Sequence, residues 1–150
     1  MFWFGRNKNR VEGKVVDLVE ERTIDASSFN NYVPSIVYGI YRHRSHIRVG
    51  NCDLRLGMND ELYYAGNIGY RIEPPYRGHG YACEACRILL DLARQKGMQE
   101  IIITCSPDNI ASLKTLEKLG GTYLETVDVP STHWLYQRGE KVKDIFKWTL

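Results

Sequence analysis

Apolar and polar residues alternate with a period of two in the first half of the chain, then change to spacings of three and four. Alternation is typical of β-strands, and spacings of three and four are typical of amphipathic helices. The first half therefore predicts strands at Val15–Val19, Ile36–Arg42, Ile47–Leu56 and Ala65–Ile72, a hairpin turn at His43–His46, and a loop or single helical turn at Asp25–Pro34.

The second half predicts two amphipathic helices, one further short helix and three strands. A long helix should start near Gly80, run to Gln95 and stop at Gly97. The other predicted elements are a buried strand Glu100–Cys105, a helix Asn109–Leu119, strands Thr122–Val127 and Asp144–Leu150, and a short helix within Pro130–Gln137. This order predicts a mixed α/β fold around one sheet, and the length of 150 residues predicts a single domain, residues 1–150.

The stretch Ile72-Glu-Pro-Pro-Tyr-Arg-Gly-His-Gly-Tyr-Ala82 joins a strand to the long helix. Its two prolines end the strand, and the start of a helix exposes unpaired N–H groups and the positive end of its dipole. Gly78 and Gly80 remove side chains that would keep a phosphate away, and Arg77 adds a positive charge. The sequence thus predicts an anion cradle suited to a diphosphate, although such glycines can also serve simply to turn the chain.

The cradle matches neither common nucleotide-binding loop. No Gly-Lys-Ser/Thr follows it, and Cys83 stands where the third glycine of Gly-x-Gly-x-x-Gly would be.

Two motifs in order resemble the GCN5-related N-acetyltransferase (GNAT) superfamily. Arg77-x-x-Gly80-x-Ala82 is similar to its Gln/Arg-x-x-Gly-x-Gly/Ala signature, between a strand and a helix as that family requires. About 30 residues later, Asn109-Ile-Ala-Ser112, followed by Leu-Glu-Lys-Leu-Gly-Gly, resembles the second cofactor segment of that family. The resemblance covers roughly Cys52 to Val127 and implies a mostly antiparallel central sheet with flanking helices and a splay between the fourth and fifth strands.

The resemblance also implies that acetyl-CoA is the co-substrate. The strand end should pair with the pantetheine arm, the cradle should wrap the diphosphate, and the second segment should hold the arm. The residues so implied are Tyr70, Arg71, Ile72, Arg77, Gly78, His79, Gly80, Tyr81, Ala82, Asn109 and Ser112.

The sequence indicates the catalytic groups less clearly than the cofactor-binding residues. Family chemistry is direct attack of an amine on the thioester, which needs an acceptor for the amine proton. Candidates are Glu73 after the strand, Asn67 as a residue that orients a water molecule, and His133 from the C-terminal segment. Many relatives place a tyrosine four residues after Ser112 to protonate the sulfur, but this chain has Leu116; Tyr123 or Tyr136 could replace it, or the thiolate could leave unaided.

The acceptor side also departs from the family. About 15 residues join Val19 to Ile36, where relatives usually have two helices that wall the substrate pocket. The pocket should therefore be open unless Phe29, Tyr32 or a partner subunit fills the gap. A homodimer is accordingly one expected assembly.

The composition limits the kinds of partner and ligand that we expect. A net charge of +2 gives no dense basic face for nucleic acid, and no apolar run reaches the roughly 20 residues of a membrane span. Cys83-x-x-Cys86 lacks a second pair with metal-site spacing, so both cysteines are expected in or near the core and no metal is expected. The absence of a secretory signal predicts reduced thiols and a cytoplasmic location.

The sequence thus favours an acetyl-CoA-dependent N-acetyltransferase acting on a primary amine of a small molecule or of a peptide or protein terminus. Two alternatives stay open: a catalytically silent acyl-CoA-binding or regulatory domain, and an enzyme that uses the cradle for a nucleotide.

Overall fold

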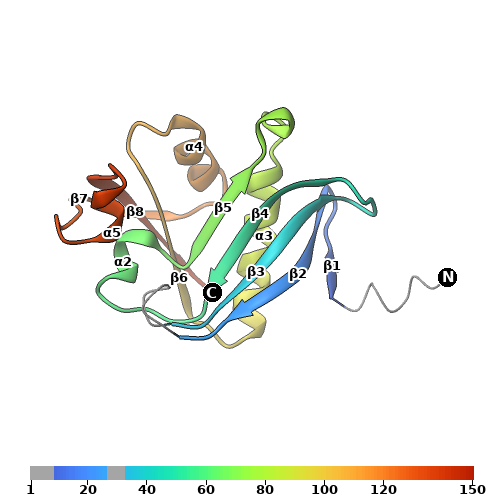
Figure 1. Ribbon diagram of the computed structural model, residues 1–150, viewed down its shortest axis with the longest axis horizontal. Helices are drawn as coiled ribbons and strands as arrows, with labels where there is room; N and C mark the ends of the chain where they lie inside the picture. The colour runs from blue at the N-terminus through green and yellow to red at the C-terminus, as the bar shows by residue number, and fades with distance from the viewer. Residues whose placement is uncertain (1–8, 27–32) are drawn as a thin grey trace.

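The structure, a computed structural model, describes residues 9–26 and 33–150 (Figure 1). Its strands are β1 (Arg10–Glu12), β2 (Val16–Ile24), β3 (Ser35–Arg42), β4 (Arg48–Arg55), β5 (Ile68–Ile72), β6 (Glu100–Cys105), β7 (Thr122–Asp128) and β8 (Val142–Thr149). Its helices are α2 (Leu62–Ala65), the 3₁₀ turn η2 (Pro74–Tyr76), α3 (Tyr81–Gln95), α4 (Ile110–Lys118) and α5 (Trp134–Gln137). The mixed α/β fold predicted from the sequence is confirmed.

The first five strands form an antiparallel sheet in chain order, β1-β2-β3-β4-β5. The predicted hairpin joins β3 to β4, and Arg42 N–H closes it by donating to the Ile47 carbonyl at 3.0 Å. Alternate residues of these strands, such as Leu18, Ile40 and Leu54, are fully buried in the core. β1 was not predicted, because three residues with one apolar side chain give no measurable period.

The last three strands form a second sheet in the order β6-β8-β7, where the sequence predicted one central sheet with a splay. The two sheets meet at Asn67, whose N–H donates to the Ile102 carbonyl at 2.6 Å and whose Oδ1 accepts from Ile102 N–H at 2.8 Å. Beyond this point β5 and β6 are not paired. This separation corresponds to the predicted splay, which lies between the fifth and sixth strands once β1 is counted.

Helix α3 packs across the five-stranded sheet against β2, β4 and β5 (Figure 1). Its buried side chains Ala85, Cys86, Leu89 and Ala93 repeat at the spacings of one helical face, as predicted. Gly97, with a φ of 88°, follows the helix end and supplies the left-handed residue that a helix stop commonly needs. The packing therefore fixes the start of α3 beside the end of β5.

One predicted strand is divided in the structure. The sequence predicted a strand over Ala65–Ile72, but α2 occupies its beginning and β5 starts at Ile68. Gly66 between them has a φ of 81°, which breaks the extended conformation. Among the described residues, no helix has the length and apolar character needed to cross a membrane.

Gly50 allows β4 to approach β5 closely, and we expect Gly50→Ala to be destabilising. A Cβ atom there would overlap the Arg71 carbonyl oxygen and lie 3.0 Å from the Ile72 Cα, both of which are backbone atoms of β5. Overpacking of this kind costs about 1–3 kcal/mol. Urea denaturation should show that loss, whereas the control Asn51→Ala, at an exposed neighbour, should change the free energy of unfolding little. Equal stability of the two variants would contradict the close strand approach.

Candidate active site

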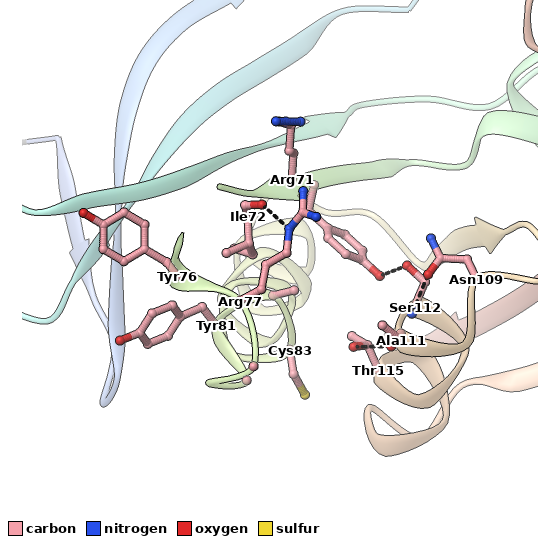
Figure 2. A pocket seen from close by; sticks show the side chains of 14 residues that line it. Arg71, Ile72, Tyr76, Arg77, Tyr81, Cys83, Asn109, Ala111, Ser112 and Thr115 are labelled. Atoms are coloured by element: carbon pink, nitrogen blue, oxygen red, sulfur yellow. Dashed lines mark hydrogen bonds between the residues drawn. The ribbon is translucent and has the colours of Figure 1, made fainter. Parts of the chain in front are cut away.

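A pocket of about 440 Å³ opens between the end of β5, the start of α3 and the start of α4 (Figure 2). Ten of the eleven predicted cofactor residues line it. The exception is His79, whose ring instead lies 5.4 Å from that of Tyr81. The pocket is lined by Tyr70, Arg71, Ile72, Tyr76, Arg77, Gly78, Gly80, Tyr81, Ala82, Cys83, Asn109, Ala111, Ser112 and Thr115. We call it the cradle pocket.

The glycines of the cradle are required by the backbone. Gly78 and Gly80 have φ values of 89° and 76°, in the left-handed region that other residues rarely adopt. A Cβ atom at either position would meet nothing within 4 Å, so the cradle opens into free space. The first hydrogen bond of α3 is from Glu84 N–H to the Gly80 carbonyl. The N–H groups of the three preceding residues therefore have no acceptor within the helix and can face an anion.

Arg77 is anchored next to these donors. Its Nε donates to the Ile72 carbonyl at 2.8 Å, which ties the guanidinium to the last residue of β5 (Figure 2). One side chain thus links the strand end to the turn before α3. Together, the positive charge and the helix dipole make this side of the pocket suited to phosphate.

The other side of the pocket is the start of α4. Asn109 caps this helix, because its Oδ1 accepts from Ser112 N–H at 3.2 Å. The Ser112 hydroxyl is 2.6 Å from the hydroxyl of Tyr70 on β5. Burial raises the pKa of Tyr70 to about 12, although the Ser112 hydrogen bond partly opposes the shift. Tyr70 therefore keeps its proton over the whole neutral range.

A second pocket of about 240 Å³ adjoins the cradle pocket, and Tyr70, Asn109 and Ser112 line both. It lies on the side of β6 and the C-terminal segment. Its charged lining residues are Arg55, Arg138, Glu140 and Lys143. The Glu140 carboxylate pairs with Lys143 and lies 3.7 Å from Arg138, while Arg55 pairs with Asp53. We call this space the polar pocket.

The three predicted catalytic residues are not brought together. Asn67 is 2% exposed, and its side chain is bonded to the Arg55 and Gly57 carbonyls and to Ile102 N–H, so no group is left to orient water. His133 is also 2% exposed; its Nε2 lies 2.8 Å from the Glu61 carbonyl, and its Nδ1 accepts from Leu135 N–H.

Glu73 is placed differently from these two residues. It is partly exposed, lies 3.5 Å from Arg71, and is not among the residues lining either pocket. Since both nitrogens of His133 and all polar atoms of Asn67 are engaged, the geometry speaks against a direct role for either.

The two cysteines of Cys83-x-x-Cys86 lie in the core, as their pattern suggested. Leu116, at the position where relatives carry a tyrosine, is fully buried. Within residues 9–26 and 33–150, no three His, Cys, Asp or Glu side chains group as a metal site. Sequence reasoning missed four lining residues of the cradle pocket: Tyr76, Cys83, Ala111 and Thr115. Helical spacing from Gly80 and Asn109 could have found Cys83, Ala111 and Thr115, whereas Tyr76 precedes Arg77 in the turn η2.

Phe29 and Tyr32, expected to fill the open acceptor side, lie outside the described residues. The structure does show that β2 extends to Ile24, well past the predicted end at Val19.

Part of this chain is similar in sequence to a protein described as an N-acetyltransferase. An "Uncharacterized N-acetyltransferase YnaD" of Bacillus subtilis is 37% identical over 54 residues, 35% of this chain and 32% of the relative. The matched part thus spans about a third of the relative's length.

Two solved structures share the fold at low sequence identity. RimL, a ribosomal L7/L12 alpha-N-protein acetyltransferase solved with coenzyme A, has a TM-score of 0.65 and 13% identity, covering 92% of this chain and 96% of its own. YncA of Salmonella typhimurium, solved with its cofactor acetyl-CoA, has a TM-score of 0.60 and 16% identity, covering 77% and 65%. The model of the acetyltransferase (GNAT) domain family matches residues 7–122, and with most of the 150 residues covered, the chain belongs to this family.

Proposed function

We propose that the chain is an N-acetyltransferase that moves the acetyl group of acetyl-CoA directly to a primary amine. One observation carries the proposal: an open glycine cradle at the start of α3 and the capped start of α4 line the same pocket. A diphosphate at the cradle would leave the pantetheine arm to run between β5 and α4 toward the polar pocket.

In this proposal the backbone of β5 at Tyr70–Ile72 positions the arm. An N–H group of the strand end polarises the acetyl carbonyl as it becomes an oxyanion. The acceptor amine enters from the polar pocket, where Glu140 is the acidic lining residue among the described ones. Because Asn67 and His133 are fully bonded, we propose that water in the polar pocket, rather than either side chain, takes the amine proton.

The acceptor is proposed to be a small-molecule amine or a peptide or protein terminus. RimL, by its description, acts on a ribosomal protein, which is an acceptor of the peptide or protein class. Measuring thiol release from acetyl-CoA with a panel of both kinds of amine would separate them.

The silent acyl-CoA-binding domain is the second candidate function. The buried Leu116 and the engaged side chains of Asn67 and His133 favour it, because none of these three described residues lines either pocket. Binding of acetyl-CoA without turnover over the whole amine panel would support this candidate and contradict the enzyme.

Calorimetry with coenzyme A, acetyl-CoA and ATP tests the cofactor assignment. We expect both CoA compounds to bind and ATP, which lacks the pantetheine arm, to bind far more weakly. Equal or tighter binding of ATP would overturn the proposal in favour of a nucleotide enzyme.

We also propose a cytoplasmic location and a homodimer. Four buried free cysteines fit a reducing compartment, and the almost fully exposed edge strand β7 offers a surface for a second copy. Cell fractionation and analytical ultracentrifugation test the two points separately.

A further inference from the structure

A pair of hydroxyl groups lies where the two pockets adjoin. Tyr70 comes from β5 and Ser112 from α4, and both residues line the cradle pocket and the polar pocket. Figure 2 marks their hydrogen bond at Ser112, with 2.6 Å between the oxygens. The pair therefore lies where a group bound in the cradle pocket would come next to an amine in the polar pocket.

The surrounding bonds indicate how the two protons are arranged. The Asn109 side chain accepts from Ser112 N–H, which holds the serine in place at the helix start. If the Ser112 hydroxyl donates to the Tyr70 oxygen, the tyrosine proton is free to point into the pockets. Burial keeps the pKa of Tyr70 at about 12, so the phenol remains a donor at any working pH.

We propose that the Tyr70 hydroxyl donates a hydrogen bond to the sulfur that leaves from acetyl-CoA, and that Ser112 is the positioning residue that orients it. The inference rests on the proposed function. The amine nitrogen forms a bond to the carbonyl carbon, the carbon–sulfur bond breaks, and its electron pair goes to sulfur. The thiolate is stabilised by Tyr70 and takes its final proton from water, while the amine proton is lost to water.

The other hydroxyl and thiol groups are placed less well for this role. Tyr123 is exposed and bonded to Thr126, and neither it nor Tyr136 is among the residues lining either pocket. Cys105 lines the polar pocket, but a thiol is a weak donor. Leu116 carries no polar group. Tyr76 and Tyr81 line the cradle pocket but not the polar pocket, so Tyr70 is the tyrosine of the described chain that lines both.

The test is a titration of the thiol of bound coenzyme A. Coenzyme A isotopically labelled at the carbon bonded to sulfur is followed by NMR across pH in the wild type, Tyr70→Phe and Tyr123→Phe. A hydrogen bond to the thiolate lowers the thiol pKa, so Tyr70→Phe should raise the midpoint by about one pH unit. Tyr123→Phe removes a similar tyrosine–hydroxyl pair outside the pockets and should leave the midpoint unchanged.

Turnover gives a second readout. With acetyl-CoA, Tyr70→Phe should lower kcat about tenfold or more with little change in KM, because the bond strengthens as charge develops on sulfur. Ser112→Ala should give a smaller shift of the same sign, and the double variant should add little to Tyr70→Phe.

The outcomes separate the two claims. If the wild type does not bind coenzyme A, the proposed function fails. If it binds, but the thiol midpoint is the same in the wild type and Tyr70→Phe, this inference alone fails. If Tyr70→Phe does not fold, Ser112→Ala carries the test, and an unchanged midpoint in that variant overturns the inference.

Discussion

Replacing Gly80 with glutamate should weaken acetyl-CoA binding by about 100-fold, because a carboxylate would then project into the space proposed for the diphosphate. A Cβ atom at Gly80 would meet no atom within 4 Å, so the new side chain should act through its charge and not by displacing neighbouring atoms. The fold should largely survive, although the left-handed backbone of Gly80 costs a side chain about 1–2 kcal/mol. Calorimetry with acetyl-CoA measures the affinity, and thermal denaturation measures the stability.

Two controls separate charge from strain. Gly80→Gln carries nearly the same shape and backbone strain without the charge, so it should bind acetyl-CoA considerably more tightly than Gly80→Glu. Gly97→Glu adds the same carboxylate at another left-handed, open glycine, which follows the far end of α3, and should bind like the wild type. Equal losses for glutamate and glutamine at position 80 would contradict an anion cradle.

The boundaries of elements with a strong hydrophobic period were predicted to within about one residue. Glu100–Cys105 is β6 as predicted, and the predicted helix from Gly80 to Gln95 became α3 with Gly80 as its cap. The helix buries one continuous apolar face and the strand is one continuous apolar run. The first and last residues of each element can therefore be read from the apolar pattern of the sequence. β1 and α2 are too short to show a period and are defined instead by their partners.

Most of the residues predicted to bind the cofactor line a single pocket, for a related reason. Backbone donors, glycines and a helix cap act locally, and they can be located by counting from a motif such as Arg77-x-x-Gly80. The catalytic candidates depended on neighbours distant in the chain. Asn67 is engaged by Gly57 and Ile102, and His133 by Glu61, and none of these partners is marked by sequence spacing.

The role proposed for Tyr70 illustrates the same limit. The sequence places its backbone at the end of a strand, where the resemblance implies pairing with the pantetheine arm. Its hydroxyl contact with Ser112, 42 positions away, depends on how β5 and α4 are brought together. A family motif can therefore indicate where a cofactor is expected to lie and still leave unmarked the side chain proposed to contact its sulfur.

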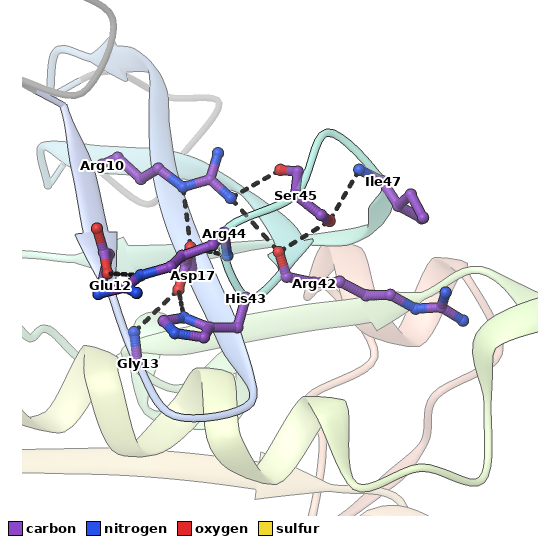
Figure 3. A network of polar contacts seen from close by, with 9 residues as sticks. All are labelled: Arg10, Glu12, Gly13, Asp17, Arg42, His43, Arg44, Ser45 and Ile47. Carbon is purple, nitrogen blue, oxygen red and sulfur yellow. Dashed lines mark hydrogen bonds and ion pairs between the residues drawn. The ribbon is translucent and has the colours of Figure 1, made fainter. Parts of the chain in front are cut away.

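Asp17 on β2 is the centre of a buried polar network that joins two turns of the first sheet (Figure 3). Its carboxylate is fully buried and lies 2.9 Å from Arg10 Nε and 2.8 Å from His43 Nδ1. It also accepts from the N–H groups of Gly13 and Arg44, at 3.0 and 2.7 Å. Burial alone would raise the pKa of Asp17, but the hydrogen bonds outweigh it and hold the pKa below its usual range.

Asp17→Asn should therefore destabilise the fold by about 3–5 kcal/mol at neutral pH, since an amide keeps one acceptor and turns a donor toward other donors. The loss should depend on pH in a defined direction. A lowered folded-state pKa contributes stability above the unfolded value of about 4 and loses it as the pH falls through the folded value. The stability gap between wild type and variant should accordingly narrow below about pH 4.

Urea denaturation of both proteins at neutral and acidic pH measures this gap, with Glu12→Gln as the matched control. Glu12 belongs to the same network through Arg44, but that pair is exposed on both sides and should contribute at most about 1 kcal/mol. Because Asp17 is not among the residues lining either pocket, acetyl-CoA affinity of the folded Asp17→Asn variant should stay close to that of the wild type. A gap that is small at neutral pH, or one that widens in acid, would show that the four donors do not stabilise the ionised carboxylate.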